Sequence, residues 1–161
     1  MGSEGGKTLV IGLGNPILGD DGVGWQIAKA AQESYQGDAT FELSSSGGLG
    51  LMELMVGYER VILADAIVTP DVHIGAVHSQ PLDKINATAH SNSSHDASLQ
   101  AALETGRRMG LQLPDEIWVV AVEIEPSYVF SETLSPAVAA AVPVAADLVK
   151  DKLEFFLAIP N

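Results

Sequence analysis

Four polar residues in this sequence could cooperate in metal or hydrolytic chemistry: Asp20, Asp21, Asp65 and His95. Two adjacent aspartates follow a glycine-rich segment after the first apolar run, a third ends another apolar run, and the histidine lies in a serine-rich segment. Carboxylates and an imidazole from three separate elements can converge into an oxygen and nitrogen site with an open position. Such a site suits a borderline divalent ion such as nickel or zinc.

Each of these residues also has an ordinary structural explanation. Asp20 or Asp21 can cap the helix that follows, although one carboxylate suffices for a cap and two adjacent ones repel each other. Asp65 can be a partly exposed turn residue, but a carboxylate at the end of a buried strand is costly without a partner or a metal. His95 can be a surface histidine in the first turn of a helix. Because the chain has neither a His-Glu-x-x-His nor a Gly-x-Ser-x-Gly motif, its chemistry depends on convergence of distant residues.

The elements that must position these residues alternate between apolar runs and helical segments. Near-continuous apolar runs at 8–12, 60–64 and 117–122 predict strands covered on both faces of a parallel sheet. Residues 40–43 predict another strand, and residues 75–79 an edge strand followed by a loop that reaches to about residue 94. His73 and His78 belong to this edge region, where we expect solvated or hydrogen-bonded side chains.

Apolar residues at helical spacing predict helices that begin near residues 23, 51, 94 and 135, the last continuing towards residue 157. Pro143 is expected to bend the last helix or to mark a late restart. The alternation predicts an α/β fold: a single-domain, three-layer doubly wound sheet of about five mostly parallel strands with helices on both faces. This domain spans residues 1–161, with residues 1–6 as a flexible N-terminus. Ligands of such sheets bind at the carboxyl ends of the strands.

Composition excludes several classes of function. The 161-residue chain has no cysteine, which excludes thiol proteases, iron–sulfur clusters and thiolate zinc sites. A formal net charge of −13 makes nucleic acid an unfavourable partner. No signal peptide or membrane span is evident, so the sequence predicts a cytoplasmic protein with no membrane partner.

Two glycines after the first strand, Gly12 and Gly14, resemble the start of a dinucleotide fingerprint. The third glycine of that fingerprint would fall at position 17, which is Ile17, and two aspartates stand where a phosphate would lie. A tight strand-to-loop turn explains these glycines equally well, and we predict no organic cofactor.

Several motifs, spread over nearly the whole chain, together resemble the maturation endopeptidases of nickel–iron hydrogenases. In chain order they are Gly12-x-Gly14-Asn15-x-x-x-x-Asp20-Asp21-Gly22-x-Gly24, Gly47-Gly48 with Met52-Glu53-Leu54, Ile62-Leu63-Ala64-Asp65-Ala66, Ser93-x-His95 and Leu134-Ser135-Pro136-x-Val138. The first and third are fairly specific in combination. The resemblance implies an α/β fold and removal of a short C-terminal extension from the hydrogenase large-subunit precursor after nickel has been inserted.

The resemblance also implies the site residues. The family's metal ligands fall on Asp21, Asp65 and His95, which are therefore the expected catalytic and metal-binding residues. The expected ion is nickel, carried by the substrate and read by these three side chains. One position departs from the family pattern: many members have aspartate immediately before the Gly-Gly pair, where this chain has Ser46.

Two other functions remain open at the level of sequence. The segment from Gly12 to Pro16 also resembles the opening motif of peptidyl-tRNA hydrolases, but the Arg-His-Asn that should follow is missing and the chain offers only eight basic residues. The change at Ser46 allows a non-catalytic binder that senses nickel in the large subunit. Cleavage of a nickel-loaded precursor distinguishes the binder from the protease.

Overall fold

Five strands form one sheet in this computed structural model, which describes residues 7–85, 94–127 and 129–159, without the side chains of residues 94–98. The sheet order is β2-β1-β3-β5-β4. The strand bounds are Thr8–Leu13 for β1, Thr40–Ser44 for β2, Arg60–Ile67 for β3, Val77–Pro81 for β4 and Glu116–Glu123 for β5. Strands β2, β1, β3 and β5 are mutually parallel, and only β4 runs antiparallel, beside β5. The predicted α/β sheet of about five mostly parallel strands is confirmed.

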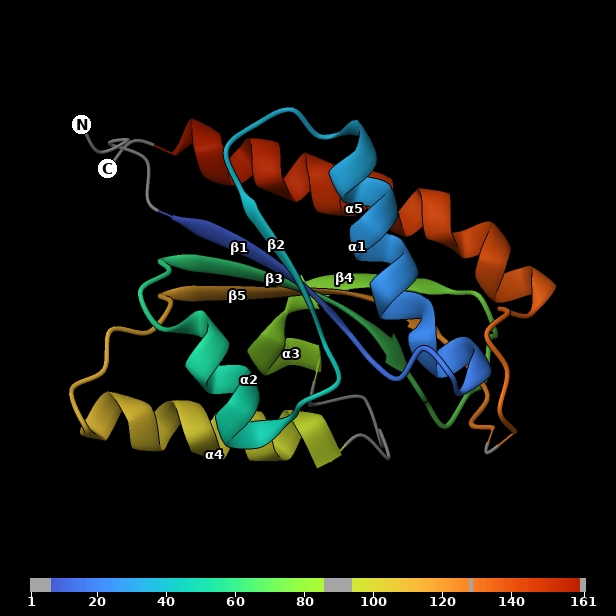
Figure 1. The fold of residues 1–161 in the computed structure, drawn as a ribbon, viewed down its shortest axis with the longest axis horizontal. Coiled ribbons are helices and arrows are strands. Elements are labelled where there is room, and N and C mark those ends of the chain that lie inside the picture. The colour runs from blue at the N-terminus through green and yellow to red at the C-terminus, as the bar shows by residue number, and fades with distance from the viewer. Residues whose placement is uncertain (1–6, 86–93, 128, 160–161) are drawn as a thin grey trace.

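Helices cover both faces of this sheet (Figure 1). Helices α1 (Val23–Ser34) and α5 (Pro136–Ala158) lie on one face, and α2 (Gly48–Met55), α3 (Leu82–Ile85) and α4 (Ser94–Arg108) lie on the other. A short 3-10 helix, η1 (Gly19–Gly22), precedes α1. Helix α5 continues through Pro143, so the predicted restart is wrong. In the described part of the chain, no helix is both long enough and apolar enough to cross a bilayer.

Alternation along the central strands divides the core into two layers. Ile62 and Val120 pack beneath α1 and α5, whereas Leu63 and Val119 belong to the layer that contacts α2 and α4. Because both faces are buried, the strands read as continuous apolar runs. Period-2 alternation then places Asp65, between Leu63 and Ile67, on the α4 side of the sheet.

The edge strand β4 begins two residues later than predicted. Gly75 has a φ of +91° and turns the chain before the strand begins. Pro81 ends β4 as a strand residue, which an edge strand permits because its outer side needs no donor. The predicted loop before α4 is wrong at its start, where residues 82–85 form α3. The rest of that loop and the predicted flexible N-terminus lie outside the described residues.

Candidate active site

Asp21 lies in η1, directly after the loop that leaves β1. The backbone N–H of Asn15 donates to Asp21 Oδ2 at 2.9 Å. Gly14 has a φ of +131°, and a Cβ atom on it would lie 2.1 Å from the backbone oxygen of Asp21. The glycine therefore permits the loop to close tightly on η1, and the turn interpretation of Gly14 accounts for its position.

Neither aspartate caps α1. The N-cap of α1 is Gly22, which has no side-chain cap, so the expectation of an aspartate cap is wrong. Asp20 instead accepts two hydrogen bonds from Ser135, one from the backbone N–H at 2.7 Å and one from Oγ at 2.8 Å. Both aspartates lie within η1, before the N-cap position, and their carboxylates bind other partners: Asp20 binds Ser135 and Asp21 binds the Asn15 amide.

Asp65 lies near the carboxyl end of β3, with Ala121 of β5 as its Cα partner. Its Oδ1 accepts the backbone N–H of Ala66 at 2.8 Å. The sequence predicted that Asp65 ends the strand, and this is wrong. The next two residues, Ala66 and Ile67, continue the pairing with β5 as far as Glu123. The half-buried carboxylate thus lies inside β3, close to the carboxyl edge of the sheet.

Close packing of Gly24 brings η1 and β3 to the same edge. A Cβ atom on Gly24 would lie 2.2 Å from the carbonyl oxygen of Leu13 and 2.4 Å from that of Ala64. The start of α1 therefore rests against the ends of both β1 and β3, which holds η1 there. Asp21 and Asp65 consequently come from neighbouring elements at the carboxyl edge, as the sequence predicted for ligand-binding residues.

His95 lies in the first turn of α4, the helix that covers the face bearing Asp65. The backbone position agrees with the predicted placement, but the side chain of His95 is outside the described residues. Among the side chains that are described, no three His, Asp or Glu residues are grouped so as to hold a metal ion. Convergence of Asp21, Asp65 and His95 on one ion stays a prediction.

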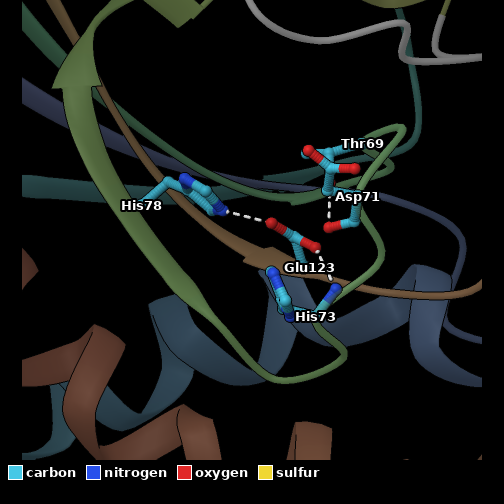
Figure 2. A network of polar contacts seen from close by, with 5 residues as sticks. All are labelled: Thr69, Asp71, His73, His78 and Glu123. Atoms are coloured by element: carbon cyan, nitrogen blue, oxygen red, sulfur yellow. Dashed lines mark hydrogen bonds and ion pairs between the residues drawn. The ribbon is translucent and has the colours of Figure 1, made fainter.

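A buried carboxylate that sequence reasoning missed, Glu123, occupies the last position of β5 (Figure 2). It is 3% exposed and accepts the backbone N–H of His73 at 2.7 Å. Its other oxygen lies 2.7 Å from Nε2 of His78 on β4. The expectation of a hydrogen-bonded side chain is thereby confirmed for His78, whereas His73 is exposed in the loop before β4. The available signal was a carboxylate at the end of an apolar run, the same signal that singled out Asp65.

The pKa of Glu123 reflects opposing effects. Burial is the largest single effect and raises the pKa, because it disfavours the charged form. Hydrogen bonds from the His73 amide and the His78 ring stabilise the carboxylate, and they hold the pKa of Glu123 below its ordinary value. Glu123 is therefore an ionised, fully engaged carboxylate that ties the loop between β3 and β4 to the end of β5.

Ser46 lies at the same edge of the sheet, between β2 and α2. It is exposed, and its backbone N–H donates to Ser44 Oγ at 3.0 Å. Gly47 is the N-cap of α2 without a side-chain cap, and Gly48 has a φ of +54°. The position that carries aspartate in many members of the family is thus a neutral surface side chain in this protein.

A cavity of about 590 Å³ opens at the opposite edge, where β5 begins. Its two cations already have partners: Arg107 donates to the carbonyl oxygen of Pro114, and Lys152 Nζ lies 3.7 Å from the ring centroid of Trp118. The cavity is remote from Asp21 and Asp65, because the strands between them run from one edge to the other. We therefore place the candidate site at the carboxyl edge and not in this cavity.

Comparisons with known proteins agree with this fold. The family model HycI, described as hydrogenase maturation protease, matches residues 26–152, a range that includes Asp65 and His95 and begins after Asp21. The hydrogenase maturating endopeptidase HybD of Escherichia coli is 27% identical, with a TM-score of 0.78 and coverage of 92% of this chain and 93% of that one. A hydrogenase 2 maturation peptidase from a Thaumarchaeota archaeon is 26% identical, with a TM-score of 0.62 and coverage of 91% and 97%. No curated protein sequence matches significantly. The family match favours the peptidase over the peptidyl-tRNA hydrolase, and the chain belongs to the hydrogenase maturation protease family.

Proposed function

We propose that this protein is the cytoplasmic endopeptidase that removes the C-terminal extension of a nickel–iron hydrogenase large subunit after nickel insertion. The observation that carries the proposal is the placement of Asp21 and Asp65 on adjoining elements at the carboxyl edge, in a chain of this family. The formal net charge of −13 adds a negative field that favours a cationic centre in the substrate.

In the proposed reaction, nickel belongs to the precursor, and the protease binds that nickel. Asp21 and Asp65 offer anionic oxygens from η1 and β3, and His95 offers an imidazole nitrogen from the start of α4. A metal centre beside the scissile bond acts as a Lewis acid on the peptide carbonyl, and binding at three ligands holds that bond in place. Since the chain supplies neither a thiol nor a serine elbow, a precursor without nickel lacks the group that completes the site.

The test compares nickel-loaded with nickel-free precursor and reads the mass lost from its C-terminus. We expect cleavage of the loaded form alone, and loss of cleavage in Asp21→Asn, Asp65→Asn and His95→Ala. If the protease instead holds its own zinc, zinc-treated enzyme should cleave the nickel-free form. That result would refute the proposal that the enzyme depends on the nickel of its substrate. Absence of any cleavage by the wild-type enzyme, with tight binding of the loaded precursor, would instead identify a nickel-sensing binder.

Ser46 supplies the specific reason to test the binder. If a carboxylate before Gly47 is needed for turnover, Ser46→Asp should create cleavage that the wild type lacks. If the wild type already cuts, the same substitution changes the choice of precursor without being required. The exposed position of Ser46 makes the substitution compatible with the fold.

A further inference from the structure

Asp20 and Ser135 lie 115 positions apart in the sequence and bind each other directly. Both carboxylate oxygens of Asp20 are used: Oδ1 accepts the backbone N–H of Ser135 at 2.7 Å and Oδ2 accepts its Oγ–H at 2.8 Å. Ser135 is the N-cap of α5, where the partial positive charge of a helix N-terminus favours a carboxylate. Hydrogen bonds of this length to an ionised acceptor are among the stronger ones in proteins.

A second pair of hydrogen bonds joins the same two segments. The backbone N–H of Gly19 donates to the carbonyl oxygen of Ser131 at 2.7 Å, and the N–H of Ser131 donates to the carbonyl oxygen of Ile17 at 2.8 Å. Leu18 and Ser131 form a parallel bridge between these bonds. The segment that leads into α5 therefore holds the start of η1 twice, through the backbone bonds of Ser131 and through the bonds of Ser135 to the Asp20 carboxylate.

The two adjacent aspartates thus have different tasks. Asp20 has no carboxylate oxygen free of a hydrogen bond, whereas Asp21 accepts one bond, from Asn15 to Oδ2, and its Oδ1 has no partner among the described residues. Asp21 is the next residue of the same single-turn helix, so its position follows that of Asp20. We propose that Asp20 is a positioning residue, which fixes Asp21 at the carboxyl edge through its bonds to Ser135; this inference rests on the proposed function of Asp21.

The experiment measures kcat/KM on the nickel-loaded precursor for Asp20→Ala, Asp20→Asn and Ser135→Ala. Loss of a residue that orients a ligand typically costs 10- to 100-fold in activity, so we expect a fall of about 10- to 100-fold for Asp20→Ala. Asp20→Asn keeps an acceptor oxygen for the Ser135 N–H and should retain most of the activity. Because the partners act as a unit, Ser135→Ala should add nothing to Asp20→Ala. Thr133→Ala, which removes a hydroxyl contact to Ser131 within the same loop, is the matched control.

A second readout is independent of cleavage. The amide hydrogen of Asn15 reports on Asp21, because it donates to that carboxylate. We expect its exchange with solvent to be faster in Asp20→Ala than in the wild type, and unchanged in Asp20→Asn and Thr133→Ala. If Asp20→Ala does not fold, Ser135→Ala provides the comparison, because it removes the Oγ–H donor to Asp20 and keeps the backbone N–H donor.

Three outcomes would overturn the inference. Unchanged Asn15 exchange in folded Asp20→Ala shows that Asp20 does not position Asp21. An Asp20→Asn variant as inactive as Asp21→Asn shows that Asp20 acts on the substrate itself. Additive losses from Asp20→Ala and Ser135→Ala show that the two residues act independently. A wild type that leaves the loaded precursor uncut contradicts the proposed function instead, and the exchange measurement still decides whether Asp20 holds Asp21.

Discussion

Replacing Glu123 by glutamine tests whether the buried carboxylate at the end of β5 holds the loop before β4. The wild-type side chain accepts bonds from the His73 amide and the His78 ring, both at 2.7 Å. Glutamine is similar in shape but uncharged, so its oxygen accepts the His73 amide in a weaker bond and its NH2 group can bind His78 only if the ring nitrogen Nε2 accepts. A hydrogen bond to a charged group contributes about 1.5–3 kcal/mol, which gives an expected loss of about 2 kcal/mol. For a domain of this size that corresponds to a Tm lower by about 4–8 °C.

The destabilisation should depend on pH in a defined direction. Because the pKa of Glu123 is lower in the folded protein than its ordinary value of 4.5, the carboxylate contributes stability above pH 4.5. That contribution is lost as the pH falls through the folded pKa. Glutamine does not titrate, so the difference in unfolding free energy between wild type and Glu123→Gln should be largest near neutral pH and shrink below about pH 4.5.

Urea unfolding at pH 7, 5, 4 and 3 measures this difference directly. The matched control is Glu125→Gln, two positions further along the chain, where the side chain is exposed. We expect the control to follow the wild type at every pH. Equal urea midpoints for wild type and Glu123→Gln at pH 7, or a difference that stays constant down to pH 3, would refute the reasoning.

Four further substitutions have predicted effects on stability or cleavage. Thr8→Val should raise the free energy of unfolding by about 1 kcal/mol, because the buried Thr8 hydroxyl has no hydrogen-bond partner among the residues that the structure describes; a destabilised variant in thermal melts would contradict this. Gly24→Ala should lower stability by about 3 kcal/mol, since its Cβ would lie 2.4 Å from the Ala64 carbonyl oxygen; an unchanged Tm would show that the helix can shift. Asp21→Asn and Asp65→Asn should each abolish precursor cleavage yet change stability by about 0.5 kcal/mol or less, so an active variant removes that residue from the site.

Local sequence patterns predicted the strands that are buried on both faces. The runs at residues 8–12, 60–64 and 117–122 predicted β1, β3 and β5, because strands covered on both faces must be apolar at every position. The edge strand was displaced by two residues, since the turn at Gly75 depends on a backbone conformation that its neighbours do not reveal. The aspartate cap on α1 was predicted from a local rule and was wrong, because Asp20 has a better partner on α5.

The sequence by itself therefore determined the α/β class, the sheet edge at which the candidate site lies, and the likeness to a protease family. These features depend on residues that are close together along the chain or that follow a regular spacing. Only the tertiary structure decided that Asp20 binds Ser135 and that Glu123 binds His78, pairs separated by 115 and 45 positions. A hydrogen bond between distant segments depends on how the helices and strands pack, and no local spacing encodes that packing.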